Sequence, residues 1–122
     1  DFKEVLNDPE VDVVVELIGG LTFAKTIILS ALESGKHVVT ANKALIAHHG
    51  QELFEAARKN NVNIFYEASV GGGIPVVVPA KESLIANNIK KIEGILNGTT
   101  NFILSLMETD NLDFSEPLCR SR

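Results

Sequence analysis

The sequence predicts an α/β fold with a parallel sheet, followed by the start of an α+β region. Three short segments, residues 11–18, 37–40 and 63–68, are rich in Val, Ile and other strand-forming residues. Two longer segments, residues 22–34 and 44–59, place apolar residues at helical spacing between them. Strands and helices that alternate in this way form right-handed βαβ units, which bring the carboxyl ends of all the strands to one edge of the sheet. Ligands of open α/β sheets bind at that edge.

The first elements have recognisable boundaries. A short helix ends before Pro9, because the residue preceding proline is disfavoured in helical backbone. The nearly continuous apolar character of residues 11–18 is typical of a strand buried on both faces, and Gly19 ends it. Thr22 is the expected N-cap of the next helix, and Gly35 is placed to end that helix.

The second and third strand ends carry the residues that suggest a site. Asn42 and Lys43 follow residues 37–40 and are expected to converge with Gly19 and the end of the third strand. A lysine there is well sited to meet a substrate oxygen or a cofactor, although a solvated lysine in an ordinary turn is the alternative. Gly71-Gly72-Gly73 follows the third strand, and inward-turned carbonyls of such a loop can bind a hard cation. The alternative is a flexible linker, but the stiff apolar residues on both sides favour an ordered hinge.

The last third of the chain predicts elements of a second domain. Residues 79–88 are expected to form a short helix, and the alternation in residues 89–96 predicts a half-exposed strand of a second sheet. In Asn97-Gly98-Thr99-Thr100-Asn101, Gly98 permits a tight turn and either threonine can cap the following helix. The exposed amides of that helix start would favour an anion, although plain capping alone explains the threonines. Residues 109–113 read as a loop, and residues 117–122 show no amphipathic period.

Composition limits the classes of function. The 122 residues have a formal net charge of -5 and a pI of about 5.1, with no cluster of Lys and Arg, which argues against a nucleic-acid partner. No apolar run approaches the roughly 18 residues that a membrane span requires. The single cysteine, Cys119, cannot form an internal disulfide, so a reducing compartment such as the cytoplasm is expected. The pair His48-His49 is expected in a surface turn rather than at a metal, because adjacent helical side chains diverge.

Three blocks of the sequence resemble homoserine dehydrogenases, the oxidoreductases that interconvert aspartate semialdehyde and homoserine with NAD(P)H. The blocks are residues 38–43 (VVTANK), 66–75 (YEASVGGGIP) and 94–101 (GILNGTTN). The resemblance implies a Rossmann-like parallel sheet, of which residues 1–74 form the second half. Residues 75–116 would begin the α+β substrate and dimerisation domain, and residues 117–122 would be a tail outside the pattern.

The resemblance also implies roles for individual residues. The nicotinamide cofactor, NAD or NADP, would be bound by Ile18, Gly19, Thr40, Ala41, Asn42 and Lys43. Lys43 would also be catalytic, since an ammonium stabilises the alkoxide that hydride transfer builds and can supply or relay a proton. Gly98 and Thr99 would lie beside the substrate. A monovalent cation, sodium, would be held by backbone oxygens of Glu67, Val70, Gly72 and Ile74.

The sequence also departs from the family pattern. It contains no Gly-x-Gly-x-x-Gly turn, and it is expected to leave the pattern near Glu116. These 122 residues alone are therefore expected to be inactive, whereas a longer parent, a homodimer or larger assembly, would be an enzyme of threonine, methionine and isoleucine biosynthesis.

Two other classes of function stay open at this point. The chain could be a non-catalytic remnant of a cofactor-binding fold, used for dimerisation or regulation. A semialdehyde dehydrogenase that acylates a cysteine ranks last, because Cys119 lies in the unpatterned tail. The choice between NAD and NADP is also open, because the residue that contacts the ribose follows an earlier strand.

Overall fold

The computed structural model describes residues 1–120, which fall into two compact units, the first being Asp1–Leu84 and the second beginning at Ile85. The first unit holds a three-stranded parallel sheet in the order β1-β2-β3. Its elements in chain order are α1 (Phe2–Asn7), β1 (Val13–Glu16), α2 (Thr22–Glu33), β2 (His37–Thr40), α3 (Lys43–Lys59) and β3 (Ile64–Phe65). This confirms the predicted alternation and the parallel sheet.

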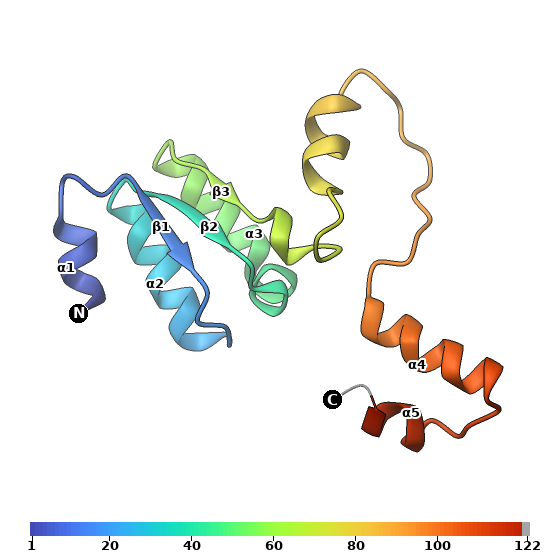
Figure 1. Cartoon of the computed structure of the whole chain (residues 1–122). Helices are drawn as coiled ribbons and strands as arrows, with labels where there is room; N and C mark the ends of the chain where they lie inside the picture. Colours follow the sequence, from blue (N-terminus) through green and yellow to red (C-terminus); the bar gives the residue numbers. More distant parts are fainter. Residues whose placement is uncertain (121–122) are drawn as a thin grey trace. The chain divides into compact units, whose positions relative to one another are not determined.

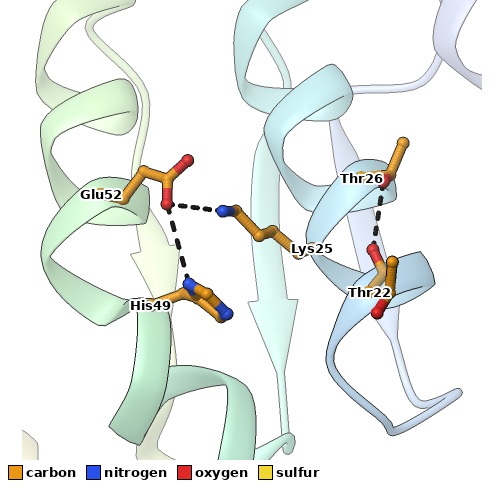
Figure 2. A network of polar contacts seen from close by, with 5 residues as sticks. All are labelled: Thr22, Lys25, Thr26, His49 and Glu52. Carbon is orange, nitrogen blue, oxygen red and sulfur yellow. Dashed lines mark hydrogen bonds and ion pairs between the residues drawn. The ribbon is translucent and has the colours of Figure 1, made fainter.

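Both connecting helices cover the same face of the sheet (Figure 1). Sequential strand order with right-handed crossovers requires this arrangement. The core is formed by Ala24, Ile28, Ala31 and Leu32 of α2, Val38 of β2, and Leu45, Leu53 and Ala57 of α3. An ion pair of 2.7 Å between Lys25 Nζ and Glu52 Oε2 ties α2 to α3 at the surface, and His49 Nδ1 lies 3.8 Å from the same carboxylate oxygen (Figure 2).

The prediction that the first strand is buried on both faces is wrong. Val13 and Val15 are exposed, Val15 by 58%, whereas Val14 is half-buried and Glu16 is fully buried. The alternation arises because, within residues 1–120, α2 packs on one face of β1 and no layer covers the other. The strand is also shorter than residues 11–18.

Other boundaries differ from the predicted ones in the first unit. Leu21, not Thr22, is the N-cap of α2, and the Thr22 carbonyl instead accepts a hydrogen bond of 3.1 Å from Thr26 Oγ1 (Figure 2). The third strand ends at Phe65 and is followed by a 3-10 turn, Glu67–Ser69. His48 and His49 lie within α3, so the prediction of a surface turn is wrong. The helix predicted over residues 79–88 is a shorter π-helical segment, Pro79–Ser83.

The described part of the second unit, residues 85–120, contains two helices, α4 (Gly98–Thr109) and α5 (Ser115–Arg120), which contact each other. The half-exposed strand predicted over residues 89–96 does not form, because a strand needs a hydrogen-bonding neighbour and the described part of this unit offers none. Asn97, not a threonine, caps α4, with its Oδ1 accepting a hydrogen bond of 2.8 Å from Thr100 N. The sequence did not predict α5. None of the helices in residues 1–120 combines the length and apolar character needed to cross a bilayer.

Candidate functional site

A buried carboxylate stands at the carboxyl edge of the sheet. Glu16 ends β1 and is 1% exposed. Its Oε1 accepts hydrogen bonds from the backbone N–H groups of Ile18 (2.8 Å) and Gly19 (2.9 Å), and its Oε2 accepts one from Thr40 Oγ1 (2.8 Å). Thr40 is the register partner of Glu16 across β1 and β2, so both side chains point to the helix-covered face. Burial of a carboxylate is tolerable here because it accepts three hydrogen bonds.

The same network continues into the loop before α3. The Thr40 hydroxyl accepts a hydrogen bond of 3.0 Å from the Asn42 N–H. Asn42 donates from Nδ2 to the Gly20 carbonyl at 2.7 Å and caps α3 by accepting from Leu45 N at 3.1 Å. These bonds join the ends of β1 and β2, as the sequence predicts.

The third strand end joins the network through Ser69. Its hydroxyl is buried and donates to the carbonyl of Thr40 at 2.9 Å. Ser69 lies in the turn that leads from β3 into the glycine loop. The prediction that three strand ends converge is therefore confirmed for the loops after β1, β2 and β3.

Lys43 begins α3 at this edge and is exposed. Its ammonium makes no hydrogen bond or ion pair within residues 1–120, so it is available to an oxygen of a bound molecule. Ile18, which follows β1, is 62% exposed and Leu17 is exposed as well. Gly19 has a φ of 79°, a conformation that glycine adopts without strain. The loops thus present a cation and apolar surface, a combination that suits a partly apolar, anionic ligand.

The six predicted cofactor residues divide into two groups by exposure. Ile18, Gly19, Ala41 and Lys43 are exposed, whereas the side chains of Thr40 and Asn42 are buried and bonded within the chain. The hydroxyl of Thr40 and the amide of Asn42 are therefore engaged in supporting the loops.

The glycine loop is ordered by the side chain of Glu67. Its carboxylate accepts hydrogen bonds from the backbone N–H groups of Val76 (2.5 Å), Val77 (2.9 Å) and Val78 (2.7 Å), which close the loop onto its own start. The bond from Val78 is the main reason why the pKa of Glu67 lies below its usual value; partial desolvation opposes that shift, and the other two bonds add to it. The side chain thus acts as a cap for the helical turns that follow.

The backbone of this loop also bears on the predicted cation. Gly71 and Gly72 both have positive φ, 71° and 63°. In residues 1–120 the carbonyl oxygens of Val70, Gly72 and Ile74 accept no hydrogen bond, while that of Glu67 accepts one from Val70 N at 3.1 Å. Oxygens with unused lone pairs are the donors that hard cations select.

The predicted substrate residues, Gly98 and Thr99, lie in the second unit at the start of α4. Both are exposed, and the nearby capping bond from Asn97 leaves their backbone N–H groups without a partner in the described chain. Cys119 is exposed in α5. No group of three or more His, Cys, Asp or Glu side chains in residues 1–120 is arranged to hold a metal.

Sequence reasoning missed three residues of this edge. The nearly continuous apolar pattern of residues 11–18 indicates no role for Glu16, no motif points to Ser69, and the resemblance implies a role for Glu67 through its carbonyl rather than its carboxylate. A charged residue at the end of a parallel strand, three residues before Gly19, is a signal that could identify Glu16, since a carboxylate there can accept the amides of the following turn.

These loops, at the carboxyl edge of a parallel sheet, define a domain of the dinucleotide-binding α/β class. The family model described as the homoserine dehydrogenase NAD-binding domain matches residues 1–67, and the homoserine dehydrogenase model matches residues 75–121. The chain belongs to the homoserine dehydrogenase family. The second match extends to residue 121.

Individual relatives agree with this assignment. A homoserine dehydrogenase of Synechocystis is 52% identical over 118 residues, which cover 97% of this chain and 27% of the relative. The crystal structure of a homoserine dehydrogenase from Thiobacillus denitrificans matches with a TM-score of 0.92 and 47% identity, over 99% of this chain and 28% of that one. A hyperthermophilic archaeal homoserine dehydrogenase in complex with NADPH matches with a TM-score of 0.82 and 30% identity, over 99% of this chain and 37% of that one. The chain thus spans little more than a quarter of the length of its curated relatives.

Proposed function

We propose that the protein carrying these residues is a homoserine dehydrogenase that interconverts L-aspartate 4-semialdehyde and L-homoserine with NAD(P)H. The observation that carries the proposal is the bonded carboxyl edge, where Asn42, the residue before Lys43, is bonded to Gly20 of the turn after β1, and where the ammonium of Lys43 has no partner within residues 1–120. The family match over residues 1–67 supports a nicotinamide cofactor at this edge, with Ile18, Gly19, Thr40, Ala41, Asn42 and Lys43 around it.

The bound nicotinamide supplies the hydride. Lys43 stabilises the negative charge that develops on the carbonyl oxygen of the aldehyde and transfers a proton to it. The buried bonds from Asn42 N to Thr40 Oγ1 and from Leu45 N to Asn42 Oδ1 fix the start of α3 and therefore the position from which the lysine side chain extends. Gly98 and Thr99 contribute backbone N–H groups to the substrate, for which the exposed start of α4 is suited.

We further propose a sodium ion at the glycine loop, bound by the carbonyl oxygens of Glu67, Val70, Gly72 and Ile74. The unused carbonyl lone pairs and the loop closure by the Glu67 carboxylate support this site. To test this site, the natural protein is titrated with sodium chloride and, in parallel, with choline chloride. Amide hydrogen exchange of the loop residues is measured at each salt concentration. Protection that rises equally with both salts would contradict the site.

The wider biological assignment follows from the same function. The protein acts in the cytoplasm in threonine and methionine biosynthesis, as a homodimer or larger assembly, without nucleic-acid or membrane partners. Residues 1–74 belong to its cofactor-binding domain, and residues 75–116 begin its catalytic domain. Residues 1–122 by themselves do not carry out the reaction, which agrees with their covering 27% of a curated relative.

The decisive experiment measures NADPH oxidation with aspartate semialdehyde in the natural protein at its full length. Lys43→Met should lower kcat by about 10²-fold to 10⁴-fold, the range expected for loss of oxyanion stabilisation and proton transfer. Lys59→Met is the matched control, because Lys59 is an exposed lysine in the last turn of the same helix. A Lys43→Met enzyme with unchanged kcat would contradict the role of Lys43. Absence of NADPH binding in the wild type would favour a non-catalytic module instead.

A further inference from the structure

We propose that Glu16 is a positioning residue: its buried carboxylate holds the turn of Ile18 and Gly19 and, through the Thr40 hydroxyl, the loop that carries Lys43. The inference rests on the proposed function, because it assigns the purpose of the network to those loops. No other carboxylate in residues 1–120 is as deeply buried.

The partners of Glu16 show what the carboxylate does. Two of its three hydrogen bonds come from backbone amides of the turn after β1, and the third comes from a hydroxyl that supports the next loop. A carboxylate that served only to fill the core would be replaceable by an apolar side chain, which often stabilises a fold more than a buried charge does. An apolar side chain could not accept the amides of Ile18 and Gly19, so the turn would lose its attachment to the strand.

The network also has a fixed direction. A carboxylate can only accept, so the single hydrogen of the Thr40 hydroxyl points to Glu16 Oε2. This leaves a lone pair of the hydroxyl free to accept the N–H of Asn42, one residue before Lys43. In Glu16→Gln, the amide oxygen can keep the bonds from Ile18 and Gly19. Its NH₂ group then faces Thr40 Oγ1 as a donor, so the hydroxyl hydrogen of Thr40 loses its acceptor and a buried donor is left unpaired between the two strands.

The test uses the natural protein at its full length with two pairs of variants. Glu16→Gln is compared with Glu33→Gln, which removes the same charge from an exposed position at the end of α2. Thr40→Val is compared with Thr40→Ser, which keeps a hydroxyl. The first readout is amide hydrogen exchange at Gly19 and Asn42 in the absence of any ligand. The second is the Kd for NADPH. The third is steady-state kinetics, from which kcat and KM are determined separately.

A positioning role predicts a local result. In Glu16→Gln, exchange at Asn42 should accelerate about tenfold or more and the Kd for NADPH should rise about tenfold, since tenfold corresponds to the loss of about one hydrogen bond. Thr40→Val should accelerate exchange and raise the Kd for NADPH more than Thr40→Ser does. Glu33→Gln should match the wild type in both measurements. kcat should fall in the folded enzyme, because Lys43 is less well placed.

Two results would overturn the inference, and they differ in what they say about the proposed function. If the wild type binds NADPH but Glu16→Gln changes only the melting temperature, with local exchange and Kd unaltered, Glu16 is a structural residue and the proposed function stands. If the wild type neither binds nor oxidises NADPH, the proposed function fails and the inference fails with it, whatever the exchange data show.

Discussion

The side chain of Asn42 makes two hydrogen bonds that substitution can separate. Its Oδ1 caps α3 by accepting from Leu45 N, and its Nδ2 donates to the carbonyl of Gly20. Serine keeps the ability to cap but cannot replace the amide donor, whereas alanine removes both bonds. Aspartate keeps the cap and replaces the donor by a second acceptor, which faces the Gly20 carbonyl.

The magnitudes follow from the two bonds. Loss of an N-cap costs about 1 kcal/mol of stability, and loss of a neutral hydrogen bond costs about 1 kcal/mol. Asn42→Ser should therefore lower the free energy of unfolding by about 1 kcal/mol and Asn42→Ala by about 2 kcal/mol. Asn42→Asp should cost more than Asn42→Ser, because it sets two oxygen acceptors against each other in a site where the side chain is only 9% exposed.

The assay is urea unfolding of the natural protein followed by circular dichroism, with amide exchange at Leu45 as the local readout. The matched control is Asn97, which caps α4 through Thr100 N and makes no second side-chain bond in the described chain. Asn97→Ser should leave the free energy of unfolding nearly unchanged, and Asn97→Ala should lower it only by the contribution of the N-cap. Equal losses in Asn42→Ser and Asn42→Ala would refute the reasoning, since the cap would then contribute nothing.

Two further residues give predictions of the same kind. Lys36 is 6% exposed, and its ammonium donates to the carbonyls of Asp8 (2.7 Å) and Val11 (2.6 Å). Lys36→Met should therefore lower the free energy of unfolding by about 2 kcal/mol. An unchanged melting temperature would show that these bonds are not stabilising. Glu67→Gln keeps one acceptor oxygen and should accelerate amide exchange at Val78, as seen by nuclear magnetic resonance; exchange that stays at the wild-type rate would contradict the closure of the loop by this carboxylate.

The sequence predicts those features that depend on local periodicity. The bounds of β2 are predicted correctly because Val38, Val39 and Thr40 form a short β-branched run, with Gly35 before it and Asn42 after it. The convergence of the strand ends is also predictable, since βαβ units make neighbouring strands parallel and parallel strands end at the same edge of the sheet.

Features that depend on partners distant in the sequence were not predictable. The alternation in residues 89–96 indicates a strand, but strand formation depends on a neighbour that local periodicity does not reveal. Glu16 looks like an interruption until its register partner, Thr40, is known. The cap of α4 was misplaced because Asn97 and the threonines all favour the N-cap position, and only the backbone conformation decides among them.

The chemistry of the carboxyl edge explains why its supports are polar. Loops after parallel strands leave the sheet ladder, so their amides and carbonyls need other partners, and an apolar side chain can offer none. Glu16, Asn42 and Ser69 come from the ends of three different strands, and their side chains satisfy backbone groups at the ends of β1 and β2. Each such bond contributes to stability and also fixes a loop that carries a proposed site residue. A variant at this edge is therefore informative only when global stability and local loop order are measured separately, as the Asn42 series does.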